Sequence, residues 1–67
     1  MKIILNNKEE IFETEELTIN ELLQLKKYTF KMLVIKVNGN IVKKSEYYTK
    51  TVVEGDDVMV LHLVSGG

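Results

Sequence analysis

The sequence predicts an α+β fold in which a mixed β-sheet wraps around one helix. Three observations lead to this prediction. Apolar residues recur at every second position in several short runs, which is the period of a β-strand. One segment has the capping residues and the apolar spacing of a helix. Turn-forming asparagine and glycine residues separate these segments along a chain of 67 residues, which is long enough for one small domain.

The first segment predicts a β-hairpin. Residues 1–5 alternate as a strand, and the Asn-Asn-Lys sequence at 6–8 predicts a tight turn because asparagine tolerates left-handed backbone conformations. A second strand is expected over residues 10–14. Two adjacent apolar side chains in that strand cannot both face the core, so either Ile11 or Phe12 points inward, and Ile11 is our expectation.

The helix is predicted over residues 19–27. Thr18 and Glu21 have the spacing of a capping box, in which each side chain accepts a hydrogen bond from a free backbone amide of the first turn. Leu17 before the cap and Leu22 at the fourth helical position can form a hydrophobic staple. Two lysines at the other end suit the negative pole of the helix dipole.

After the helix, the sequence predicts a second hairpin and a helical turn. Residues 32–37 alternate as a strand, the Asn-Gly-Asn sequence at 38–40 predicts a turn, and residues 41–42 give a short strand. Ser45 is expected to cap a single helical turn that carries Tyr47, an aromatic plug beneath the sheet.

The end of the chain predicts a last strand and a tail. The Glu-Gly-Asp-Asp sequence at 54–57 forms a turn, and residues 58–64 form the strand. The order strand, strand, helix, strand, short strand, strand describes a β-grasp fold. We therefore predict one β-grasp domain at residues 1–64 and a flexible Ser-Gly-Gly tail at residues 65–67.

Composition and charge exclude several classes of protein. The chain has 9 Lys and Arg against 10 Asp and Glu, so the basic excess of a small nucleic-acid-binding domain is missing. It has no cysteine for disulfides or thiolate metal sites. No apolar run approaches the roughly 18 residues of a membrane span, and we expect a cytoplasmic protein. So short a chain cannot build both a core and a deep catalytic cleft, so we expect a carrier or binding module rather than an enzyme.

Candidate catalytic and metal-binding residues are few. His62 is the only histidine, and its alternation with valines indicates a strand residue rather than a ligand or a base. Five glutamates precede the helix: Glu9, Glu10, Glu13, Glu15 and Glu16. We interpret them as the solvated side chains of a strand edge and a loop, where negative charge suits the helix N-terminus. We predict no metal site.

The Gly66–Gly67 pair is the strongest functional signal. Glycine has no Cβ atom, so these residues can enter a narrow channel of another protein and present a carboxyl group there. A terminal carboxyl group has a pKa of about 3.3–3.7, and its ionised form is a poor electrophile. It reacts only after another enzyme converts it to an acyl adenylate with ATP, and it can then accept sulfur or another nucleophile. We expect this chain to bind no cofactor itself.

The last strand is apolar on both faces. Alternation turns Val58 and Val60 toward the core, with His62 as a third candidate. The outward residues are Met59, Leu61 and Leu63, joined by Val34 and Ile4 if their strands are neighbours. A strand with one wet face would alternate apolar and polar residues. We therefore predict that the outward face, with Met59, Leu61, Leu63 and Val34, binds a partner protein.

Several segments resemble the ThiS family, the bacterial-type sulfur carriers of thiamine biosynthesis. They are residues 17–23, 37–42, 54–58 and 65–67. The resemblance covers nearly the whole chain and implies a ubiquitin-like β-grasp fold. It implies that a ThiF-type enzyme adenylates Gly67, that a cysteine desulfurase relay supplies sulfur, and that the resulting C-terminal thiocarboxylate serves thiazole synthase (ThiG). Gly66 is then the flexible partner of Gly67.

One departure and two alternatives accompany this resemblance. Lys43-Lys44 stands where relatives often have a proline, which affects only the local turn. Ser65 also precedes the glycines in MoaD, the molybdopterin-synthase small subunit, although that carrier is usually longer and often has prolines before its ending. Sulfur delivery to molybdopterin or another acceptor is therefore the first alternative. A β-grasp module that binds partners without covalent chemistry is the second.

Overall fold

The computed structural model describes residues 1–28 and 32–63. The elements in chain order are β1 (Lys2–Leu5), β2 (Lys8–Ile11), β3 (Glu16–Thr18), α1 (Ile19–Leu25), β4 (Leu33–Val37), β5 (Asn40–Val42), the 3-10 helix η1 (Lys44–Glu46), β6 (Thr51–Val53) and β7 (Asp57–His62). The main sheet has the strand order β2-β1-β7-β4-β5, and β3 pairs with β6 separately. Because β7 runs parallel to β1 and antiparallel to β4, the sheet is mixed, as predicted.

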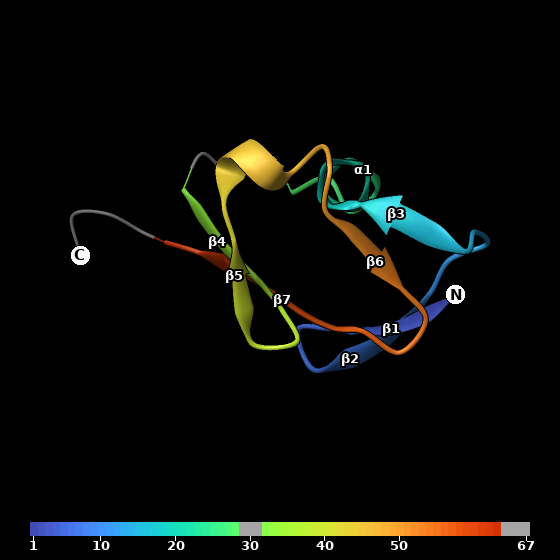
Figure 1. Cartoon of the computed structure of the whole chain (residues 1–67). Coiled ribbons are helices and arrows are strands. Elements are labelled where there is room, and N and C mark those ends of the chain that lie inside the picture. The colour runs from blue at the N-terminus through green and yellow to red at the C-terminus, as the bar shows by residue number, and fades with distance from the viewer. Residues whose placement is uncertain (29–31, 64–67) are drawn as a thin grey trace.

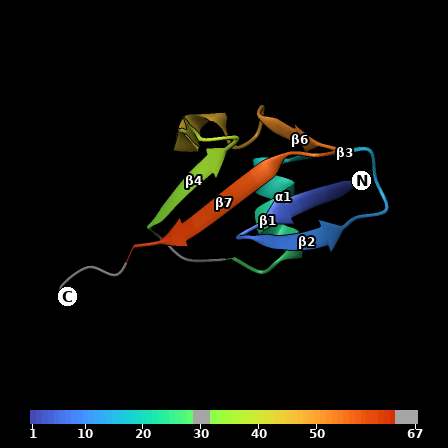
Figure 2. The same cartoon turned by 90° about the horizontal axis from the view of Figure 1, so that it is seen from below.

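Helix α1 covers one face of the main sheet (Figures 1 and 2). Apolar side chains from both layers meet between them and are removed from water, which is the main favourable contribution to folding. The buried residues are Ile3, Leu5, Leu17, Ile19, Leu22, Leu23, Ile35, Val37, Val42, Val52, Val58 and Val60. This arrangement is the predicted β-grasp.

Two hairpins with two-residue turns form the flanks of the sheet. In the first turn Asn6 and Asn7 have φ of 51° and 68°, and in the second Asn38 and Gly39 have φ of 52° and 84°. Positive φ at both central residues is the geometry of a type I′ turn, whose twist matches that of the strands. The second turn is one residue shorter than predicted because Asn40 already begins β5.

The bounds and the orientation of the second strand were predicted wrongly. β2 spans Lys8–Ile11 rather than residues 10–14, and its register brings Ile11 opposite Lys2. Opposite side chains in a sheet share a face, so Ile11 lies with Lys2 on the outer face, where it is 76% exposed. Phe12 packs against the core instead.

The helix begins as predicted. The Thr18 hydroxyl accepts a hydrogen bond from the Glu21 N–H at 3.1 Å, and the Glu21 carboxylate accepts one from the Thr18 N–H at 2.9 Å. Leu17 and Leu22 are both buried, at the positions that a hydrophobic staple requires. The capping box therefore fixes where the chain turns from β3 into α1.

The helix ends at Leu25, two residues earlier than predicted. Lys27 adopts a left-handed backbone conformation with φ 58°. Its N–H donates to the Gln24 carbonyl at 3.1 Å, and the Tyr28 N–H donates to the Leu23 carbonyl at 2.8 Å. These two bonds form a Schellman motif, which stops the helix although lysine is less suited than glycine to the left-handed position.

Strands β3 and β6 are additions to the predicted elements. Each has three residues, which is too short for an apolar alternation to be recognised in the sequence. They pair antiparallel, with Leu17 opposite Val52, and both of these side chains are buried. The small second sheet therefore closes the core beside the N-terminus of α1.

The predicted helical turn exists as η1, but Ser45 lies inside it and does not cap it. Lys43 is the N-cap residue, and its N–H donates to the Glu46 carboxylate at 2.9 Å. The Glu46 carboxylate therefore bonds the N–H of the cap residue, and no serine hydroxyl caps the turn. Tyr47, which follows η1, is half buried and packs against the core, as predicted.

Candidate partner-binding site

Strand β7 is held by hydrogen bonds on both sides. Toward β1, the Val60 N–H donates to the Asn6 side-chain oxygen at 2.7 Å, and the Asn6 N–H donates to the Val58 carbonyl at 2.9 Å. The Asn6 side chain thus continues the hydrogen-bond ladder between β1 and β7 beyond Leu5, the last residue of β1. Toward β4, pairing extends past the strand end, since the Leu63 N–H donates to the Met32 carbonyl at 2.9 Å.

A second asparagine fixes the start of β7. The Asn38 side-chain oxygen accepts from the Asp57 N–H at 2.9 Å, and its amide donates to the Asp56 carboxylate at 3.0 Å. Asp56 in turn accepts from the Val53 N–H at 3.0 Å. The turn between β4 and β5 is therefore tied to the turn that precedes β7.

The predicted reactive tail follows this strand. β7 ends at His62 rather than at residue 64. Residues 64–67, which include Gly66 and Gly67, lie outside the described residues, so the role assigned to these glycines stays a prediction. What the structure provides is the anchored strand from which they continue.

Two of the three outward residues of the last strand, Leu61 and Leu63, are exposed as predicted, whereas Met59 is half-buried. Leu61 and Leu63 are 42% and 47% exposed, whereas Val58 and Val60 are 0% and 8% exposed. Register joins this face to neighbouring strands, because Val34 lies opposite Leu61. We call the apolar residues of this face the outer patch: Ile4, Met32, Val34, Ile41, Met59, Leu61 and Leu63.

Two members of the outer patch are missing from the sequence prediction. Lys36 of β4 lies between Ile41 on β5 and Met59 on β7, and it is paired with both. Met32 lies beside Leu63. The signal that would have found Ile41 is the two-residue turn, since it sets the register of β5 on β4. An exposed apolar surface of this kind on a small domain is typical of a protein-binding site.

His62, the third candidate for a core residue of this strand, is not buried. It follows Val58 and Val60 on the inner side of β7, but it is exposed. The reason is the length of the strand, because the C-terminal end of β7 extends past α1 (Figure 2). An inner position is buried only where the helix covers it.

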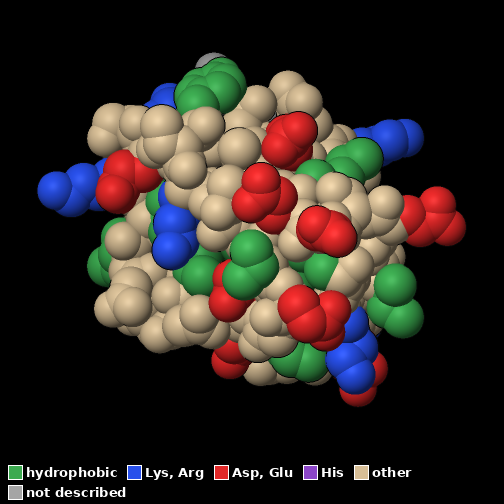
Figure 3. Space-filling view, turned by 45° about the vertical axis from the view of Figure 1, so that its right-hand side comes forward, with side chains coloured by type: hydrophobic (Ala, Val, Ile, Leu, Met, Phe, Trp, Pro, Cys, Tyr) green, Lys and Arg blue, Asp and Glu red, His purple; other side chains and the backbone are tan. Residues whose placement is uncertain are grey.

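Charge is segregated along the chain. Residues 1–21 contain two lysines and six glutamates, whereas residues 22–50 contain seven lysines and one glutamate. Acidic side chains gather on the side that carries β3 and β6 (Figure 3). Exposed lysines are found on η1 and at its cap, at Lys43 and Lys44. The acidic side chains of the chain are therefore concentrated on one side of the molecule.

One ion pair joins the acidic hairpin to the helix. Lys26, the C-cap of α1, donates a hydrogen bond from its ammonium group to the Glu10 carboxylate. This hydrogen bond raises the pKa of Lys26 above its ordinary value of 10.5. Glu10 lies opposite Ile3, on the side of the sheet that α1 covers, which explains how the pair forms.

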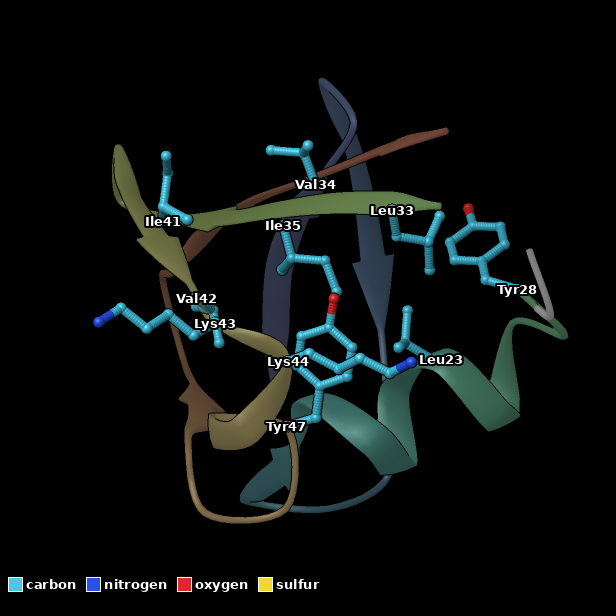
Figure 4. A pocket seen from close by; sticks show the side chains of 10 residues that line it. All are labelled: Leu23, Tyr28, Leu33, Val34, Ile35, Ile41, Val42, Lys43, Lys44 and Tyr47. Atoms are coloured by element: carbon cyan, nitrogen blue, oxygen red, sulfur yellow. The ribbon is translucent and has the colours of Figure 1, made fainter. Parts of the chain in front are cut away.

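A pocket opens on the inner side of β4 and β5 (Figure 4). It has a volume of about 690 Å³ and is bounded by the end of α1, by β4 and β5 and by η1. Apolar and aromatic side chains dominate its lining, with Leu23, Tyr28, Leu33 and Tyr47 among them. The sequence analysis did not predict this pocket, because its walls come from segments that are far apart in the chain.

Neither a metal site nor a membrane span is found in the described part of the chain. Within residues 1–28 and 32–63, no three His, Asp or Glu side chains are grouped so that they could hold a metal ion. No helix in these ranges is long and apolar enough to cross a membrane. The features available for function are therefore the outer patch, the pocket and the strand that leads to the tail.

Comparison with known proteins identifies the family. The family model described as the ThiS family matches residues 2–67, which include every element of the fold and both terminal glycines. The chain belongs to the ThiS family. This match confirms the resemblance and the ubiquitin-like β-grasp fold that the sequence predicted.

Solved structures of ThiS proteins agree with this fold. A crystal structure of the thiamine biosynthesis protein (ThiS) from Geobacter metallireducens superposes with a TM-score of 0.90 at 28% identity, covering 100% of both chains. An NMR solution structure of a thiamine biosynthesis protein from the same organism has a TM-score of 0.80 at 26% identity, covering 100% of this chain and 88% of that one. No curated protein matches the chain.

Proposed function

We propose that this ThiS-family chain is a sulfur carrier of thiamine biosynthesis and not itself an enzyme. The observation that carries the proposal is the family match over residues 2–67, because it includes the terminal Gly-Gly pair as well as the β-grasp body. The similarity to the thiamine biosynthesis protein (ThiS) from Geobacter metallireducens along its whole length supports the same pathway.

In the proposed chemistry the C-terminal carboxylate of Gly67 is the reacting group. Its oxygen attacks the α-phosphorus of ATP in the active site of a ThiF-type adenylyltransferase, and pyrophosphate leaves. The terminal sulfur of an enzyme persulfide, formed by a cysteine desulfurase relay, then attacks the acyl carbon, and AMP leaves, which gives an acyl disulfide. A second thiol attacks the enzyme sulfur of this acyl disulfide, so that a disulfide forms between the two thiol sulfurs and the C-terminal sulfur is released. The product is a thiocarboxylate, whose sulfur passes to thiazole synthase (ThiG). ATP is bound and consumed by the partner, in the cytoplasm.

The body of the domain has a separate role in this proposal. A partner that works on the tail must hold the domain while Gly66 and Gly67 lie in its active site. The outer patch lies on β7, the strand that leads to the tail, and it offers Leu61 and Leu63 for such a contact. We propose that the activating enzyme docks on this patch. Burial of apolar surface favours association by about 25 cal/mol for each Å² removed from water.

The proposal is tested by intact-mass spectrometry. The protein is incubated with ATP, a ThiF-type enzyme, a cysteine desulfurase, cysteine and a thiol reductant. The expected product is heavier by the replacement of one oxygen with one sulfur, and the modified atom maps to Gly67. A matched chain without Gly67 is expected to fold normally and to stay unmodified. An unchanged mass of the full chain with an active enzyme would contradict the carrier chemistry and favour a module that only binds.

The outer patch is tested separately by Leu61→Asp. A charge at the centre of the patch is expected to weaken binding of the ThiF-type enzyme by at least about tenfold, since burying an unpaired carboxylate is costly. The free energy of unfolding is expected to change by less than about 1 kcal/mol because the side chain is already exposed. The control is Ile11→Asp, which places the same charge on β2, outside the patch. Equal weakening by both variants would contradict the assignment.

A further inference from the structure

We propose that the free edge of β5 and the pocket beside it bind an extended acidic segment of a partner protein, which adds to the main sheet next to β5. This surface adjoins the outer patch, with which it shares Ile41 and Val34, and it does not involve the tail. The inference therefore does not depend on the sulfur chemistry, and it stands or fails by its own test. Three features carry it: a free strand edge, an apolar pocket beneath that edge, and a basic border.

The edge is open because β5 is the last strand in the order of the main sheet. The two-residue turn makes Val37 and Asn40 the closing hydrogen-bonded pair of the hairpin. Hydrogen-bonded and non-hydrogen-bonded pairs alternate, so the next pair, Lys36 and Ile41, is non-hydrogen-bonded. The N–H and C=O groups of Ile41 consequently point away from β4, toward the free edge. An extended peptide can pair with these groups by β-strand addition.

The pocket gives the added strand a place for side chains. Figure 4 shows Ile41 and Val34 on one side of the sheet, and Ile35, Val42 and Tyr47 on the other side, where the pocket lies. Successive side chains of an added strand would point alternately to these two sides. Every second residue of the partner therefore reaches the pocket, and the residues between reach the outer side beside Ile41. A volume of about 690 Å³ accepts a large apolar or aromatic side chain.

The border of the pocket selects an acidic partner. Lys43 and Lys44 both line the pocket and are exposed. Lys43 points away from the other labelled side chains in Figure 4, whereas Lys44 extends toward Leu23. Lys36, opposite Ile41, adds a third positive charge on the outer side of the sheet. The partner chemistry that fits is an alternation of apolar residues facing the pocket with carboxylates on the outer side, where Lys36 lies, and such charge complementarity mainly sets specificity and association rate.

The test uses a synthetic peptide that alternates glutamate with valine, carries one central tryptophan on the valine face, and is capped at both ends. Because this protein has no tryptophan, the fluorescence of the peptide reports binding without interference. We expect a blue shift of that fluorescence on addition of the protein, and affinity that falls as salt is raised. The same peptide with lysine in place of glutamate is expected not to bind. Absence of binding by the acidic peptide would overturn the proposal.

Two pairs of variants locate the bound peptide. Ile41→Pro removes the free N–H at the edge, where proline is tolerated in a strand, and is expected to abolish binding. Ile41→Ala keeps the N–H and is expected to retain affinity within about threefold of the unchanged protein. Lys36→Glu is expected to weaken binding about tenfold, and Lys8→Glu, an equal charge change on β2, by less than about twofold. Equal affinity of the proline and alanine variants, both shown to be folded by circular dichroism, would overturn strand addition.

A second copy of this chain is the competing occupant, because β2 offers an acidic edge of its own. Sedimentation of the protein alone distinguishes this case. A monomer at the concentrations used for the peptide supports the proposal. A dimer that Ile41→Pro dissociates would overturn it and assign the edge of β5 to self-association.

Discussion

The two hairpins at the flanks of the sheet share one turn geometry and differ in what lies beneath them. Both close on two residues with positive φ, Asn6-Asn7 in one and Asn38-Gly39 in the other. In the first hairpin, β2 presents glutamates, and Glu10 is bonded to Lys26 at the end of α1. In the second, β5 lies above a pocket and is followed by exposed lysines.

The difference shows that turn chemistry sets register, whereas the neighbouring layer decides how an edge is used. Charged side chains on a short edge strand discourage pairing with other chains. β2 has such charges, and an ion pair to the helix also closes its inner side. β5 has the apolar pocket on its inner side. The two hairpins therefore share one turn geometry, but the edge of β2 is protected and the edge of β5 is available for pairing with another chain.

The largest expected effect comes from the inward side of the second hairpin. Ile35→Ala removes a side chain that is 0% exposed, and we expect a loss of about 3 kcal/mol in the free energy of unfolding, because a cavity remains in the core. Ile41→Ala, at a position that is 66% exposed, should cost less than about 0.5 kcal/mol. Urea denaturation of both variants measures the contrast. Equal losses of stability would contradict the register of β4 and β5, which turns Ile35 inward and Ile41 outward.

The second effect is a difference between the two turns in how much stability is lost when their first asparagine is replaced. Asn6→Gly keeps the freedom to adopt positive φ but removes the oxygen that accepts from the Val60 N–H, and we expect a loss of about 1–2 kcal/mol. Asn6→Asp retains an acceptor and should lose clearly less. Asn38→Gly removes more exposed bonds and should cost about 0.5–1 kcal/mol. Thermal unfolding of the three variants tests this order, and a larger loss for the Asn38 variant than for Asn6→Gly would contradict it.

The smallest effect concerns the ion pair that only the first hairpin has. Glu10→Gln is expected to lower the free energy of unfolding by less than about 1 kcal/mol at neutral pH, because both side chains are partly exposed. The pKa of Lys26 is raised in the folded state, so the contribution linked to its charge is complete below the ordinary value of 10.5 and is lost as the pH rises through the higher folded value. Measuring the free energy of unfolding of the Glu10→Gln variant and of the unchanged protein from pH 7 to pH 11 checks this. The difference between the two free energies should shrink only at the alkaline end.

Local patterns in the sequence were sufficient for much of the fold. The capping box of Thr18 and Glu21 and the asparagine turns act within a few residues, so they can be recognised before any tertiary contact is known. The alternation along the last strand likewise predicted that Val58 and Val60 are buried and that Leu61 and Leu63 are exposed. These patterns placed the helix start and the outward Leu61 and Leu63 correctly.

Features that depend on register or on a neighbouring layer were not predictable in the same way. Ile11 and Phe12 are adjacent, and only the pairing of β2 with β1 decides between them. His62 has the alternation of an inner residue, but its burial depends on how far α1 extends. The pocket depends on the end of α1, on β4 and β5, and on η1 together. Burial is a property of the assembled layers and not of the local pattern.

The central position of β7 has a mechanical consequence. A partner that grips the C-terminal residues pulls along the axis of this strand, and the hydrogen bonds to β1 and β4 lie across that direction. The load is therefore shared by the backbone hydrogen bonds on both sides of β7, which are loaded in shear and must break together. An edge strand pulled away from its sheet would instead lose its hydrogen bonds one after another. Traction on the tail can thus draw the domain against its partner without unravelling the sheet.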